Sequence, residues 1–211
     1  MIEHLTFPNI GFLKATLSDA DMQPIRKEIA EIQEDFENTY KANNFLVGNI
    51  KKEFKISKSA DHIASVLPKY VQEFENRNNF FRSQDVLDQN CPIMLKNVWV
   101  NFQERYEFNP VHDHNGLLSF VIWTKIPYKI EDEINQGPGK DSRQPLAGHF
   151  CFYFTDALGT IRQYSIPADQ TMENTILLFP AKLNHSVHPF YSSEEYRISV
   201  SGNICYQTGN N

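Results

Sequence analysis

Apolar residues between positions 22 and 36 recur at alternating intervals of three and four, which predicts an α-helix with one buried face. The residues of this face are Met22, Ile25, Ile29, Ile32 and Phe36. Ser18 to Asp21 supply side chains that cap a helix start, and Pro24 fits the first turn. The preceding segment, Phe12 to Leu17, is predicted as an edge strand.

A second helical pattern begins at Ser59. Its predicted inward residues are Ile63, Leu67, Tyr70 and Phe74. Pro68 interrupts this pattern, and proline inside a helix removes a backbone donor, so we expect a kink or two shorter helices. The lysine-rich segment Lys51 to Lys58, between the two patterns, receives no assignment.

From about residue 95 onward, short segments rich in β-branched and aromatic residues replace the helical pattern. They cover 97–102, 117–126, 147–155, 160–166, 174–179 and 196–205, with a hairpin turn at 157–160. Many short strands without alternating helices predict an antiparallel double-sheet jelly roll or barrel. We expect one domain over residues 1–211, in which the mostly helical residues 1–94 support a jelly-roll core at 95–206.

A polar stretch over residues 129–145 lies between two predicted strands and contains Gly137-Pro138-Gly139. Long structureless loops are uncommon in compact domains and are often active-site lids, while a plain hairpin connection is equally compatible with this sequence. We expect this loop, with Asn101 and Gln103, on the substrate side of a site.

Charge and cysteine content restrict the function classes. The chain of 211 residues has a formal net charge of −6, which argues against nucleic acid as its partner. Its three cysteines lack the spacing of a metal site, and from the sequence pattern we expect neither a signal peptide nor a membrane span. We therefore expect a cytoplasmic protein with free thiols.

The most informative residues are histidines. His112 and His114 are two positions apart, so on a strand they share one face, while Asp113 points to the other. His185 is the candidate for a third metal ligand, and His188 is its competitor. We assign the remaining histidines to surface or hydrogen-bonded core positions: His4, His62 and His149.

Arg197 and Ser199 follow His185 and share one face of a predicted strand. A guanidinium group matches a carboxylate with two parallel hydrogen bonds, and Ser199 can add another. An arginine buried on a strand needs an anionic partner, which an anionic cosubstrate would supply. The alternative is a surface ion pair of Arg197 with Glu194 or Glu195.

Several motifs, in their order along the chain, resemble the iron(II)/2-oxoglutarate-dependent oxygenases, and more narrowly a branch found in bacteria and marine phages. They lie at 99–101, 109–114, 118–123, 179–180, 185–187 and 197–199. The resemblance covers roughly residues 95–206 and implies a double-stranded β-helix with iron at its mouth. It also implies a dioxygenase, an oxidoreductase that hydroxylates an unidentified substrate with Fe(II) and 2-oxoglutarate. If a phage encodes the chain, its location would be the host cytoplasm.

The resemblance also implies roles for single residues. His112 and His185 would be the two histidine ligands of the iron. Arg197 would bind the distal carboxylate of 2-oxoglutarate with help from Ser199. Trp123 falls about where many relatives have a tyrosine that touches this cosubstrate.

The chain departs from the family at the remaining ligand. The usual pattern is His-x-Asp or His-x-Glu, but this chain has His114 at that position. Strand parity favours His114 as the ligand, giving a metal site of His112, His114 and His185, whereas a local bulge would turn Asp113 inward. A neutral ligand in place of a carboxylate makes the site one charge more positive.

Two other interpretations stay open. One is a cupin-type metalloenzyme that uses the three histidines without 2-oxoglutarate. The other is a non-catalytic jelly-roll module with a decayed metal site. We expect a small molecule or a peptide as the substrate, and no membrane partner. The sequence does not identify the substrate, because the fold does not choose among substrates. Homo-oligomerisation also stays open.

Overall fold

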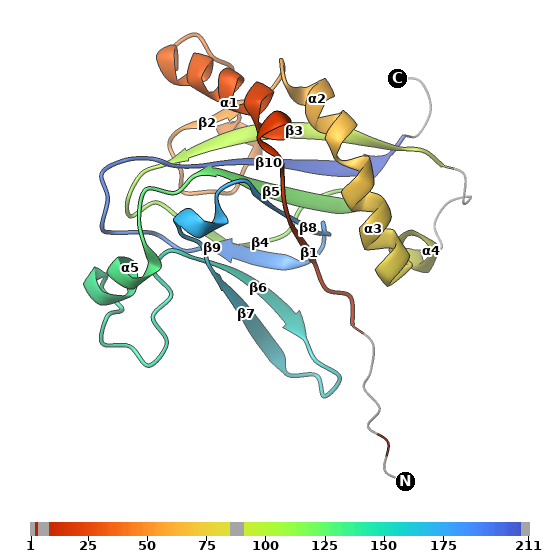
Figure 1. Cartoon of the computed structure of the whole chain (residues 1–211). Helices are drawn as coiled ribbons and strands as arrows, with labels where there is room; N and C mark the ends of the chain where they lie inside the picture. Colours follow the sequence, from red (N-terminus) through yellow and green to blue (C-terminus); the bar gives the residue numbers. More distant parts are fainter. Residues whose placement is uncertain (1–2, 4–8, 85–90, 208–211) are drawn as a thin grey trace.

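The computed structural model, which describes residues 3, 9–84 and 91–207, contains two antiparallel β-sheets (Figure 1). The six-stranded sheet has the order β1-β8-β5-β10-β3-β2, and the four-stranded sheet has the order β4-β9-β6-β7. The strands are β1 (Leu13–Thr16), β2 (Glu53–Lys55), β3 (Ile93–Gln103), β4 (Asn109–His112), β5 (Leu118–Lys125), β6 (His149–Thr155), β7 (Ile161–Pro167), β8 (Thr175–Pro180), β9 (Asn184–Val187) and β10 (Arg197–Tyr206). The predicted jelly-roll class is confirmed.

Helices α1 (Asp19–Glu34), α2 (Ala60–Val66) and α3 (Pro68–Asn78) lie over the outer face of the six-stranded sheet (Figure 1). Ser18 and Asp21 form a reciprocal capping box at the start of α1, as the sequence indicates, but Pro24 lies a turn further into the helix than predicted. The second pattern forms two helices, and Pro68 is the first residue of α3, where its missing N–H costs no helical bond.

Strand alternation separates the packing core from the site. Val98, Val100 and Phe102 of β3 face the helices and belong to a core shared with α1, α2 and α3. The intervening residues of β3 face the other sheet. A second core lies between the sheets and includes Val121, Trp123, Phe150, Phe152, Leu177 and Phe179. The six-stranded sheet is thus apolar on its outer face and mixed on its inner face.

The expectation of a structureless loop over 129–145 is wrong in its first half, which forms α5 (Ile130–Gln136). Glu133 of this helix is fully buried. Its carboxylate accepts hydrogen bonds from the backbone nitrogens of Tyr191, at 2.6 Å, and Ser192, at 2.9 Å. These bonds fix the helix to the segment that precedes β10.

The shorter elements are α4 (Phe80–Gln84) and the 3-10 turns Asn43–Phe45 and Gln170–Met172. Within the described residues, no helix has the length and apolar character needed to span a membrane. The thiols of Cys91, Cys151 and Cys205 are free, as predicted.

Candidate metal and cosubstrate site

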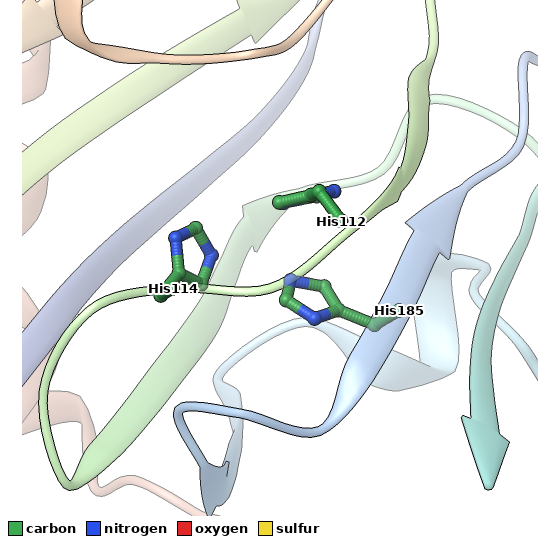
Figure 2. Close-up of side chains that lie close together, drawn as sticks. All are labelled: His112, His114 and His185. Atoms are coloured by element: carbon green, nitrogen blue, oxygen red, sulfur yellow. The ribbon is translucent and has the colours of Figure 1, made fainter.

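His112 and His185 face each other across two neighbouring strands. His112 is the last residue of β4, and its antiparallel partner on β9 is His185. Directly opposed residues of an antiparallel pair project from the same face of a sheet. Their ring centroids are accordingly 4.2 Å apart (Figure 2).

His114 joins this pair from outside the strand. The prediction that a strand carries it is wrong, because β4 ends at His112. Its backbone nitrogen nevertheless donates to the carbonyl of Ala181, at 2.8 Å, which holds this residue beside the turn before β9. Its ring centroid lies 4.9 Å from that of His112 and 5.0 Å from that of His185 (Figure 2). One nitrogen of each of the three rings lies within 4.8 Å of the others.

Asp113 points away from these histidines. Its side chain is exposed and lies 3.3 Å from the ammonium group of Lys182. The register between β4 and β9 does shift, but between Asn109 and His112, before the His-x-His motif. The alternation over residues 112–114 is therefore undisturbed, as parity predicts.

Backbone carbonyls orient two of the rings. Nδ1 of His112 lies 2.8 Å from the carbonyl oxygen of Pro110, and Nδ1 of His185 lies 2.9 Å from that of Leu183. A ring that donates its Nδ1–H to a carbonyl keeps the Nε2 lone pair free for a metal.

Burial keeps the three imidazoles neutral. It lowers the pKa of His185 to about 3 and that of His114 to about 4, with a further contribution from the neighbouring histidines. Burial also lowers the pKa of His112. Neutral imidazoles at neutral pH are the form that binds a metal, so the donor set fits iron.

Arg197 lies on the facing sheet, with 2% of its surface exposed. Its Nε and one Nη donate to Oε1 of Gln103, at 3.1 and 2.7 Å, and the other Nη donates to the hydroxyl of Tyr128, at 2.6 Å. A further bond of 2.8 Å goes to the carbonyl of His188. Within the described residues, no carboxylate lies within 4.0 Å of Arg197.

The alternative of a surface ion pair at Arg197 is wrong. Glu194 pairs with Arg105, and Glu195 pairs with Lys125. A buried guanidinium held by neutral groups alone lacks a counterion, which makes it a fitting partner for a small dicarboxylate.

A family model described as "Putative 2OG-Fe(II) oxygenase" matches residues 97–203, slightly more than half of the chain. The chain belongs to this oxygenase family. It is therefore an oxidoreductase of the class that uses iron(II) and 2-oxoglutarate, as the motifs predict. No curated protein matches its sequence.

Solved structures of low sequence identity share the fold of this oxygenase. A prolyl-4-hydroxylase from Pseudomonas putida matches with a TM-score of 0.56 at 12% identity, covering 93% of each chain. OsALKBH1 matches with a TM-score of 0.54 at 9% identity, covering 94% of this chain and 100% of that chain. The alpha-ketoglutarate-dependent carbocyclase SnoK from nogalamycin biosynthesis matches with a TM-score of 0.52 at 12% identity, covering 94% of this chain and 83% of that chain. These matches confirm the double-stranded β-helix.

One cavity of about 690 Å³ in the oxygenase is lined both by the three histidines and by the region of Arg197. His112, His114, His185, Arg197, Ser199 and Trp123 all line it. Ser199 accepts a hydrogen bond of 3.2 Å from Nδ2 of Asn101. A volume of this size accommodates a small dicarboxylate together with part of a substrate.

Tyr128 is a residue that the sequence interpretation missed. Its hydroxyl contacts Arg197, whereas the indole of Trp123 packs edge-on against Phe150, with centroids 5.8 Å apart. Tyr128 follows β5 by three residues, immediately before the polar stretch that we took for a loop. The signal available in the sequence was an aromatic residue just after a predicted strand of apolar residues.

The other histidines lie outside the cluster. The ring nitrogens of His62 and His149 each lie 2.9 Å from a backbone carbonyl oxygen, as the assignment to hydrogen-bonded positions predicts. His188 contributes its backbone carbonyl to Arg197, and its ring is not part of the metal-type group. His4, which we also assigned to such a position, lies outside the described residues.

The mouth of the cavity differs from the prediction. Asn101 and Gln103 line the cavity as expected, but none of the described residues that line it comes from 129–145. The unassigned segment before α2 lines it instead, through residues between Tyr40 and Ser57. Strand β2, at the edge of the six-stranded sheet, fixes part of this segment against β3.

Glu53 of β2 lines the cavity with 1% of its surface exposed. Burial, with a smaller contribution from the nearby Glu107 carboxylate, raises the pKa of Glu53 to about 8. A raised carboxyl pKa contributes stability that is complete below the unfolded value and is lost as the pH rises through the folded value.

As the pH rises from 5 to 9, the free energy of unfolding of Glu53→Gln should increase relative to that of the wild type by on the order of 3 kcal/mol. Urea unfolding at both pH values measures this difference. Glu73→Gln, an equivalent change at an exposed position of α3, serves as the control. A difference between Glu53→Gln and the wild type that does not change with pH would contradict the prediction.

Proposed function

We propose that this oxygenase holds iron(II) through His112, His114 and His185, and that Arg197 and Ser199 bind 2-oxoglutarate. One observation carries the proposal: three converging imidazoles line the same cavity as a buried arginine that has no carboxylate partner among the described residues. A metal cluster alone would suit many enzymes, but the unpaired guanidinium adds a site for an organic anion.

The bound iron and 2-oxoglutarate supply the oxidising power, so that 2-oxoglutarate, O₂ and a substrate C–H bond give succinate, CO₂ and an alcohol. The chain's own residues bind and orient these groups. Gln103 and Tyr128 fix the plane of the guanidinium, which sets the direction from which a carboxylate can bind. Phe150 stacks on His185, with centroids 5.5 Å apart, and Phe179 meets its edge, so the ring is held in an apolar surrounding.

We propose Trp123 as a wall of the cosubstrate region, because it is the neighbour of Ser199 in the sheet register. We also propose that residues 1–94 and 95–206 form one domain. Strands β1 and β2, which come from the first part, pair with β8 and β3 of the second. A small molecule or a peptide is the proposed substrate class. The net charge of −6 and the partly enclosed cavity support this class over nucleic acid.

The test is succinate formation from 2-oxoglutarate by the iron-loaded chain with ascorbate and O₂. We expect slow succinate formation even without the substrate, and none under argon. Anaerobic addition of 2-oxoglutarate to the iron-loaded protein should also produce a charge-transfer absorption band. Tight iron binding with neither succinate nor this band would contradict the proposal.

That outcome would favour a second candidate, a three-histidine metalloenzyme that does not use 2-oxoglutarate. The specific observation in its favour is the third imidazole where the family pattern has a carboxylate. Metal analysis of the purified protein distinguishes iron from zinc in that case.

A further inference from the structure

A row of polar side chains crosses the inner face of the six-stranded sheet, starting at the proposed cosubstrate position. In the sheet register, Trp123 is opposite Ser199, Ser199 is opposite Asn101, and Asn101 is opposite Glu53. All four side chains line the cavity. Because neighbouring strands are about 4.8 Å apart, Glu53 lies about 10 Å from Ser199, at the far end of this row.

Glu53 carries a buried carboxyl group at this end of the cavity. Asn43 donates a hydrogen bond of 3.1 Å to its Oε2. Across the described ranges, no lysine, arginine or histidine nitrogen lies within 4.0 Å of the Glu53 carboxylate. Burying a carboxylate is costly unless a cation or several donors compensate it. A cationic ligand group would provide this compensation.

The charged groups around Glu53 do not supply that cation. Glu107 is also buried, and its charge opposes ionisation of Glu53. The ammonium group of Lys51 lies 3.8 Å from the carboxylate of Glu107 and forms an ion pair with that residue. Lys55 and Lys96 line the cavity from exposed positions. Glu53 is therefore the buried acidic group at this end of the cavity, and the two lysines that line the cavity are exposed.

Two amide oxygens add acceptors that lack donors. Asn101 is 5% exposed and donates from its Nδ2 to Ser199, and its buried Oδ1 has no hydrogen-bond partner in the described part of the chain. Oδ1 of Asn109 is likewise buried and unpartnered. Both this oxygen and Oε1 of Glu53 lie close to the backbone of Gly48, so the two side chains are neighbours at this end of the cavity. A ligand that donates several hydrogen bonds would satisfy this group.

The cavity mouth next to these acceptors is apolar. Tyr40, Phe45 and Val47 line it, with 63%, 76% and 58% of their surfaces exposed. Exposed apolar side chains grouped at a cavity mouth are typical of a ligand-binding surface. A substrate that covered them would carry an apolar part beside its donor group.

We propose that the primary substrate carries an amine, protonated in its bound form, on an apolar body, and that Glu53 binds this ammonium group. The unpartnered oxygens of Asn101 and Asn109 accept its further N–H bonds, and the residues of the mouth cover the apolar body. The identification of the bound molecule as the substrate rests on the proposed function. The ammonium site itself depends only on the cavity.

The test uses calorimetry on the full chain with three probes of equal length: hexylamine, hexanol and hexanoate. We expect hexylammonium to bind at least about tenfold more tightly than hexanol, and hexanoate to bind most weakly. Glu53→Gln should remove this preference, whereas Glu73→Gln should retain it. Asn109→Ala should reduce hexylammonium affinity about fivefold, since one hydrogen bond to a charged donor is lost.

Proton release provides a second readout. With a pKa of about 8, Glu53 is mostly protonated at pH 7, so binding of an ammonium group beside it releases most of one proton to the buffer. Titrations in two buffers of different ionisation enthalpy measure this release, which should be absent in Glu53→Gln. Circular dichroism of that variant verifies that it is folded.

Several outcomes would overturn the inference: no binding of hexylammonium, equal affinity for hexanol, a preference for hexanoate, or a preference that survives Glu53→Gln. These outcomes are distinct from failure of the proposed function. A wild-type chain that forms succinate but shows no ammonium preference contradicts the inference alone. A chain that prefers ammonium but forms no succinate contradicts the proposed function and retains the binding site.

Discussion

Arg197→Ala is expected to raise the KM for 2-oxoglutarate about 100-fold or more, because removing one partner of a buried charge pair costs several kcal/mol. The guanidinium is buried and held in position by Gln103 and Tyr128, so its loss leaves a buried carboxylate without its partner. Iron affinity should change little, since Arg197 comes from the sheet that faces the histidines. Initial rates of succinate formation against 2-oxoglutarate concentration measure the effect.

Two graded variants sharpen this prediction. Arg197→Lys should remain strongly impaired, because a lysine ammonium group cannot replace the bonds of the guanidinium to Gln103, Tyr128 and the His188 carbonyl and also bind a carboxylate. Tyr128→Phe removes one hydrogen bond to the guanidinium and should raise the KM roughly fivefold. Arg105→Ala, at an exposed ion pair with Glu194, is the control for loss of one positive charge. An unchanged KM in Arg197→Ala would exclude this residue from cosubstrate binding.

His114→Ala is expected to lower iron(II) affinity by at least about 100-fold, because it would remove a direct ligand of the proposed site, and changes beyond the direct ligands already cost 10–100-fold. Asp113→Asn should leave the affinity nearly unchanged, since Asp113 is exposed beside Lys182. His114→Asp, which recreates the usual carboxylate pattern of the family, should retain iron binding. Anaerobic competition titrations with a chelator measure all three variants.

The opposite ranking would contradict the three-histidine assignment. If Asp113→Asn lost iron while His114→Ala kept it, the carboxylate would have to turn inward, against the alternation over residues 112–114. Circular dichroism of each variant distinguishes loss of a ligand from loss of folding.

Periodicity predicted the parts of the fold that are governed by burial. The apolar face of α1 and the proline at the start of α3 could be read directly from the spacing of residues. Parity alone predicted that His112 and His114 share a side and that Asp113 does not. That prediction held although β4 ends at His112, since an extended chain keeps its alternation beyond the last ladder bond.

Tertiary contacts determined what the sequence did not predict. β2 has only three residues, Glu53–Lys55, and its exposed lysine and buried glutamate do not give the apolar pattern of a strand. It forms because Phe54 packs into the helical core while β3 supplies hydrogen bonds. The partner of Glu133 in α5 lies almost sixty positions further along the chain, so its local polar sequence resembled a loop. Contacts between residues so far apart in the sequence leave no local sequence pattern.

The central claim is that one cavity binds iron through three imidazoles and 2-oxoglutarate through Arg197. A crystal structure of the anaerobic iron(II) and 2-oxoglutarate complex, with anomalous diffraction at the iron edge, tests it most directly. We predict one anomalous peak bonded to nitrogens of His112, His114 and His185, and the distal carboxylate of 2-oxoglutarate on Arg197. A peak bonded to Asp113 in place of His114, or 2-oxoglutarate bound away from Arg197, would contradict the account.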